Sequence, residues 1–130
     1  MGRIRKNIEV SGKQFWTLFD TGSRNTYVVN TVAEGFNISQ ISKSRKVSLG
    51  DKEHLLNKVF LLQAKVEGYP VEMDSYILDD IGSDENGKKI DILFGVLAMQ
   101  KWGIRPLPDE ERLDMTHYSK EFVEFIEIMK

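Results

Sequence analysis

The sequence predicts an all-β domain, mainly β with a few short helices. Apolar and polar residues alternate near the N-terminus, where Ile4, Ile8 and Val10 fall on one face of a half-buried strand. The later apolar runs are short and are separated by turn-forming residues, as in a sheet built from hairpins. A helical period is confined to brief segments, so strands should dominate the architecture.

The N-terminal part is expected to contain three short strands. Ser11-Gly12-Lys13 is a turn signal between the first strand and a β-rich run at residues 15–19, which stops at a cluster of turn formers. Thr26–Val29 resumes β character. Residues 31–36 are expected to form a single helical turn that ends at Gly35.

The middle of the chain predicts two hairpins. Residues 43–57 resemble two strands around a polar tip at Gly50-Asp51-Lys52. Residues 59–66 and 71–78 flank the turn-forming Gly68-Tyr69-Pro70, which indicates a second pair of strands.

The C-terminal part combines one more strand with helical segments. Residues 79–89 are acidic and contain glycine, so we expect a loop, and residues 90–94 give the next apolar strand. Val96–Trp102 suits a short helix ended by Gly103. Residues 118–129 keep an amphipathic helical period, which predicts a C-terminal helix.

Bulk composition favours one folded domain over residues 1–130, with 41% hydrophobic and 29% charged residues. A net charge of -2 argues against nucleic-acid binding, and the lack of a long apolar stretch argues against membrane insertion. With no cysteine and two histidines, we expect no metal and no cofactor. The N-terminus lacks the apolar core of a signal peptide, so a cytoplasmic location is expected. Trp16 and Trp102 are predicted to be core aromatics.

Asp20-Thr21-Gly22-Ser23 is the sharpest chemical feature of the sequence. Asp20 directly follows a buried run, where a carboxyl group is costly unless it is hydrogen-bonded or functional. Thr21 supplies a hydroxyl for local hydrogen bonds and Gly22 supplies backbone freedom. An isolated Asp-Thr-Gly is usually an ordinary turn at the end of a strand, so its interpretation depends on a second motif.

The second motif is Leu93-Phe94-Gly95, an apolar run that ends in glycine and leads into a short helix. The order of strand, Asp-Thr-Gly, strand, two hairpins, apolar-apolar-Gly and helix resembles the retropepsin-like aspartic proteases, the single-domain enzymes of clan AA. The resemblance spans roughly residues 10–105, and residues 94–104 look most like the cellular and prokaryotic branch. It implies a closed acid-protease barrel in which Leu93, Phe94 and Gly95 buttress the loop that carries Asp20.

The resemblance also implies a homodimer. Peptide hydrolysis in this family needs one carboxylate to activate water and a protonated carboxyl to polarise the scissile carbonyl. The chain has a single Asp-Thr-Gly and is too short for a two-lobed enzyme, so Asp20 must meet its own copy across a two-fold axis. The expected activity is that of an endopeptidase on peptide or unfolded-protein substrates. Thr21 would stiffen the loop, Gly22 would contact substrate backbone, and Ser23 would hydrogen-bond the carboxylate.

Two features depart from the retroviral pattern. The tip Gly50-Asp51-Lys52, which by position would be the flap over a bound peptide, is charged where retroviral enzymes have a glycine-rich tip. Arg24 and Asn25, candidate substrate-binding residues, stand where those enzymes usually carry acidic residues, and Val96 replaces the arginine that pairs with them. These departures favour a rival hypothesis, in which a dimeric peptide- or protein-binding module keeps the fold but does not cleave. The intact Asp-Thr-Gly favours the enzyme, which stays the leading hypothesis.

Overall fold

The computed structural model describes residues 3–118, and this part of the chain folds into nine strands, one α-helix and one 3-10 helix. All but Tyr118 of the predicted C-terminal helix, residues 118–129, lies outside the described residues. The elements are β1 (Arg3–Val10), β2 (Lys13–Asp20), β3 (Thr26–Val29), β4 (Ser39–Leu49), β5 (Lys52–Val66), β6 (Tyr69–Leu78), β7 (Ile92–Phe94), α1 (Val96–Trp102), β8 (Arg105–Leu107), η1 (Pro108–Glu110) and β9 (Arg112–Asp114).

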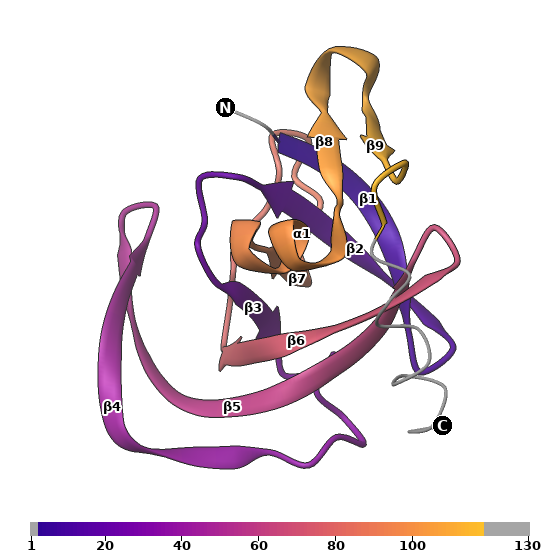
Figure 1. The fold of residues 1–130 in the computed structure, drawn as a ribbon. Coiled ribbons are helices and arrows are strands. Elements are labelled where there is room, and N and C mark those ends of the chain that lie inside the picture. Colours follow the sequence, from indigo (N-terminus) through magenta and orange to yellow (C-terminus); the bar gives the residue numbers. More distant parts are fainter. Residues whose placement is uncertain (1–2, 119–130) are drawn as a thin grey trace.

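Seven strands form one sheet in the order β1-β2-β7-β3-β6-β5-β4 (Figure 1). β7 is the key to this topology, because it runs parallel to β2 and antiparallel to β3 and so separates two strands that are neighbours in sequence. β1 also pairs with β5 through Glu9 and Lys65, so the strand at one edge of the sheet contacts β5 near the other edge. The closed barrel expected from the sequence depends on this one pairing.

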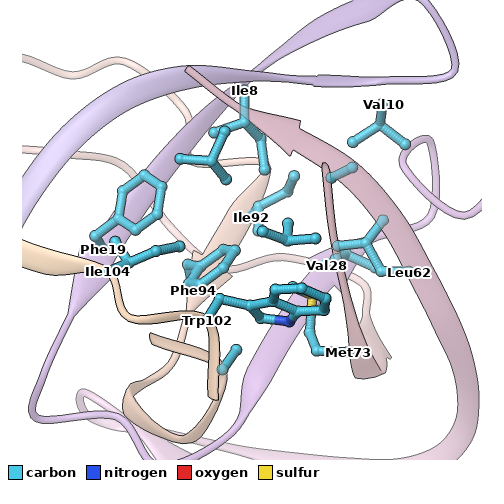
Figure 2. Packing of buried hydrophobic residues seen from close by; sticks show 14 of the residues in the cluster. Ile8, Val10, Phe19, Val28, Leu62, Met73, Ile92, Phe94, Trp102 and Ile104 are labelled. Carbon is cyan, nitrogen blue, oxygen red and sulfur yellow. The ribbon is translucent and has the colours of Figure 1, made fainter. Parts of the chain in front are cut away.

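The main core lies between the strands around β7 and helix α1, as Figure 2 shows. Trp102 is fully buried there, which confirms the prediction of a core aromatic. The rings of Phe19 and Phe94, on the paired strands β2 and β7, lie 4.7 Å apart between centroids. Such an aromatic contact adds packing energy to the area that the two rings bury. It therefore ties the strand that ends at Asp20 to the second motif.

Trp102 makes a polar contact that can be tested. Its indole N–H donates to the carbonyl oxygen of Glu72 at 2.8 Å inside the core. We expect Trp102→Phe to lower the free energy of unfolding by about 2–3 kcal/mol, because it leaves a buried carbonyl unpaired and a small void. Chemical denaturation measures the change. Trp16→Phe, at a half-buried site, is the control and should cost about 1 kcal/mol; equal losses would contradict the explanation.

The helical turn predicted at residues 31–36 is absent. Val32, Ala33 and Phe36 instead donate their backbone N–H groups to the carbonyl three residues earlier, which makes consecutive turns. The segment is too short to propagate a helix, and Val32 and Ala33 are anchored by burial in the core. Packing rather than helix propensity therefore sets its shape.

β5 is one strand of 15 residues, where the sequence suggested a break near Asn57. The strand changes partner at this point. Val59 lies opposite Ser39 on β4 and also opposite Tyr76 on β6. The polar residues before Val59 thus mark the passage from the outer hairpin into the main sheet and do not mark a turn.

The small hairpin of β8 and β9 was not predicted. Pro106 sits within β8 opposite Leu113, and proline is tolerated there because the sheet has only two strands. Leu113 is buried in the main core, so the hairpin is anchored to the core through this side chain. Within residues 3–118, no helix has the length and apolar character needed to span a membrane.

Candidate active site

Asp20 is the last residue of β2, and its side chain is 17% exposed. The backbone N–H of Gly22 donates to its Oδ1 at 2.8 Å, and the N–H of Ser23 donates to its carbonyl oxygen at 3.0 Å. The backbone therefore turns sharply after the strand and holds the carboxylate by one oxygen. The geometry presents a fixed, partly open carboxylate at the end of a buried strand.

Backbone hydrogen bonds from the residues after the second motif hold this loop in place. The backbone N–H of Val96 donates to the carbonyl of Ser23 at 2.7 Å, and the N–H of Leu97 donates to the carbonyl of Arg24 at 3.2 Å. Both donors belong to the first turn of α1, where N–H groups have no partner inside the helix. The start of α1 and the Asp20 loop thus satisfy each other's backbone groups.

Gly95 allows the two motifs to meet. A Cβ atom at this position would lie 2.2 Å from the carbonyl oxygen of Asn25, far inside contact distance. The Gly95 N–H also donates to Oγ1 of the buried Thr26 at 3.1 Å. Leu93 and Phe94 of β7 pair directly with Leu18 and Phe19 of β2. The structure therefore brings together the two motifs that the sequence singled out.

Ser23 differs from the expectation. Its hydroxyl donates to the carbonyl of Asn25 at 3.0 Å and not to the Asp20 carboxylate. The serine therefore stabilises the loop, because its one hydroxyl hydrogen is used there. The roles expected for Thr21 and for Gly22 toward substrate stay predictions.

Arg3 is a neighbour of Asp20 that the sequence analysis missed. The two residues lie opposite each other on β1 and β2, and Nε of Arg3 is 3.5 Å from Oδ2 of Asp20. The Arg3 side chain is 55% exposed, so water weakens the attraction. The turn at Ser11 and Gly12 could have indicated this contact. It sets the register of the hairpin, which places Arg3 opposite Asp20.

The predicted flap is the hairpin of β4 and β5, which Figure 1 shows as a long curved arm beside the rest of the sheet. Gly50 has a φ of 61° at the tip, and Asp51 and Lys52 are exposed beside it. Among its contacts, the apolar side chains Val47 and Leu49 of the arm pack against a second cluster that contains Leu18 and Leu93. The hairpin therefore covers apolar side chains on strands β2 and β7.

We expect this arm to be the most mobile regular element. Most side chains of β4 are exposed, so its hydrogen bonds are supported by few buried contacts. Hydrogen exchange should be faster for amides of residues 46–57 than for those of residues 15–19 in β2. Equal protection of the two segments would rule out a flap that opens.

The loop of residues 79–89 is anchored over Trp16. The indole N–H of Trp16 donates to Oδ2 of Asp84 at 2.9 Å, and the ammonium of Lys88 lies 3.9 Å from the ring centroid. Trp16 is half-buried and packs against the second apolar cluster, so it lies at the edge of the core and not in its centre. Desolvation raises the pKa of Asp84, but hydrogen bonds from Trp16, Lys88 and Asn86 outweigh it and leave the pKa lowered. The anchor therefore weakens as pH falls through that lowered value.

Arg24 and Asn25 follow the Asp20 loop directly and line a shallow depression of about 270 Å³ together with Tyr76 and Leu97. Their backbone carbonyls face the second motif, whereas their side chains help to form this surface. Among residues 3–118, no cluster of His, Asp and Glu has the arrangement of a metal site.

Solved structures with a similar fold include retroviral proteases and a retroviral protease-like domain. The retroviral protease-like domain of Ddi1 from Leishmania major has a TM-score of 0.62 at 12% identity, covering 88% of this chain and 88% of that chain. EIAV protease complexed with the inhibitor HBY-793 has a TM-score of 0.57 at 12% identity, covering 78% of this chain and 88% of that one.

The foamy viral protease-reverse transcriptase in complex with an RNA/DNA hybrid has a TM-score of 0.56 at 15% identity, covering 82% of this chain. This chain spans 12% of the length of that larger protein. No protein-family model matches the sequence, and no curated protein matches it. The likeness is one of fold, and the chain has the retropepsin-like, all-β fold expected from its sequence.

Proposed function

We propose that this chain is an aspartic endopeptidase of the cellular or prokaryotic retropepsin-like branch that works as a homodimer. Asp20 of each subunit supplies one of two catalytic carboxyls. The proposal is supported chiefly by the way the Asp-Thr-Gly loop is held. One carboxylate oxygen of Asp20 accepts a hydrogen bond from the backbone of its own loop. The second motif holds that loop in place with further backbone hydrogen bonds.

The proposed chemistry follows from two carboxyls that face each other. Like charges at close range disfavour double ionisation, so the pair holds one proton between its members. The ionised carboxyl takes a proton from water, and the resulting hydroxide attacks the scissile carbonyl while the protonated carboxyl donates to its oxygen. The tetrahedral intermediate then collapses, a proton passes to the leaving nitrogen, and the C–N bond breaks.

In this proposal, Gly22 and the flap tip, Gly50 to Lys52, contact the bound substrate. Gly22 contacts the peptide backbone beside Asp20, and the flap closes over the bound peptide. Opening of the flap uncovers the buried apolar cluster that contains Leu18 and Leu93, which favours substrates with apolar side chains next to the cleaved bond. We further propose that residues 1–130 form a single domain, without a cofactor, and that the protein acts in the cytoplasm.

A cleavage assay tests the function. The purified full chain is incubated with reduced, alkylated casein over the acid to neutral pH range, with and without pepstatin, and its mass is measured by light scattering. We expect a dimer that produces casein fragments and is inhibited by pepstatin. A dimer that binds casein but never cleaves it would support the binding module instead, and a monomer at micromolar concentration would contradict the shared site.

A further inference from the structure

The depression beside the Asp20 loop carries an excess of positive charge. Arg24 and Lys101 are exposed and line it, and Asp74 is the single acidic residue in its lining. Within residues 3–118, the side chain of Arg24 forms no hydrogen bond and no ion pair. A cation at the rim of a concave surface, free of an internal partner, is suited to an anionic ligand.

Tyr76 adds a hydrogen-bond donor to the wall of this depression. Its hydroxyl oxygen accepts from Nη2 of Arg45 at 2.6 Å, and the Arg45 guanidinium lies 5.3 Å from the ring centroid. Because the oxygen accepts from a cation, the hydroxyl hydrogen remains to be donated outward. Arg45 belongs to β4, so the proposed flap and the depression are linked through this contact.

The position of Arg24 relative to Asp20 is fixed by the backbone. The carbonyl of Arg24 accepts from Leu97, and Gly95 lets the neighbouring chain approach closely. An anion bound by Arg24 therefore lies beside the loop that carries Asp20. The side chain of Leu97, 47% exposed, offers an apolar surface for the methylene groups that precede a carboxylate.

We infer that this depression binds an acidic side chain of the substrate, so that the enzyme selects peptides with a Glu or Asp near the cleaved bond. The inference rests on the proposed function for its consequence, which is selective cleavage. Arg24 and the Tyr76 hydroxyl donate to the carboxylate, and Lys101 adds attraction. Asp74 opposes it, so its removal strengthens binding. Hydrogen bonds between charged partners are strong enough to give a preference of about tenfold.

Matched peptides provide the test. A set of peptides built on one casein segment places Glu, Gln or Lys at each position in turn, and kcat/KM is measured for each. We expect wild type to prefer Glu over Gln by about tenfold at one position. Arg24→Met should abolish the preference, Arg24→Glu should turn it toward Lys, and Asp74→Asn should increase it. Lys13→Met, an exposed cation at the opposite end of β2, should leave it unchanged.

Binding of the same peptides to the Asp20→Asn protein, measured by fluorescence anisotropy, separates this inference from the proposed function. Binding of the Glu peptide that depends on Arg24, without cleavage by wild type, would sustain the site and contradict the protease. Cleavage by wild type with the same Glu-to-Gln ratio in Arg24→Met would overturn the site and leave the protease standing. Absence of any preference in both assays would also overturn the site.

Discussion

Asp20→Asn should lower casein cleavage by at least about a thousandfold while the fold and the dimer remain. An amide can neither take a proton from water nor share one with its partner across the proposed two-fold axis. Asparagine keeps a side-chain oxygen that can accept from Gly22 N–H, so the loop retains its main hydrogen bond. Only the partly exposed ion pair with Arg3 is lost, and the removal of two neighbouring acids offsets that loss.

The measurements that accompany this variant are the melting temperature and the mass in solution. Both should match wild type closely. In the parent protein, cleavage should follow a bell-shaped pH dependence whose limbs belong to the pair of carboxyls. If the Asp20→Asn protein cleaved casein as fast as its parent, the proposed mechanism would be wrong. If it melted far below the parent, Asp20 would be structural and the binding module would become the better hypothesis.

Gly95→Ala should destabilise the protein strongly and abolish cleavage. The new methyl group would lie 2.2 Å from the Asn25 carbonyl oxygen and 2.8 Å from that of Arg24, and both are backbone atoms that cannot rotate away. The loop and β7 must therefore move apart, which breaks the hydrogen bonds that hold the Asp20 loop. We expect the free energy of unfolding to fall by about 3 kcal/mol or more.

Gly68→Ala is the matched control for this substitution. A Cβ atom there meets nothing within 4 Å, although the φ of 83° disfavours any other residue. The cost should be about 1–2 kcal/mol, from the left-handed backbone alone, with cleavage retained. If the two variants unfolded at the same denaturant concentration, close contact with the Asn25 carbonyl would not be the reason for Gly95.

Much of the fold could be predicted because local patterns and tertiary packing agree. The strands containing Ile8, Phe19 and Val28 were found near their observed positions, since alternation or an apolar run matched their burial. The errors arose where tertiary packing determines the local backbone conformation. Residues 31–36 are held by buried Val32 and Ala33, and β5 continues through Asn57 because it exchanges one partner strand for another. Neither influence is visible in a short window of sequence.

The candidate site, like the fold, could be predicted from the sequence only in part. Asp20 and Gly95 were identified from motifs, because the chemistry and the close approach each demand one residue type. Arg3 was missed because its relation to Asp20 depends on strand register over the whole hairpin. The depression near Arg24 required the positions of Tyr76 and Arg45, which come from distant strands. A residue's partners across a sheet are a property of the topology and cannot be read from its neighbours in the chain.

The insertion of β7 between β2 and β3 has a consequence for how the protein is made. Trp16 and Asp91 hydrogen-bond to each other across 75 residues of sequence, so the sheet around Asp20 cannot close until Asp91 has been synthesised. Pairings between such distant segments slow folding, typically to milliseconds or seconds. On a ribosome, strands β4, β5 and β6 emerge before β7, the strand that leads into the second motif. The loop that carries Asp20 thus gains its backbone hydrogen bonds only after β7 and the start of α1 have been synthesised.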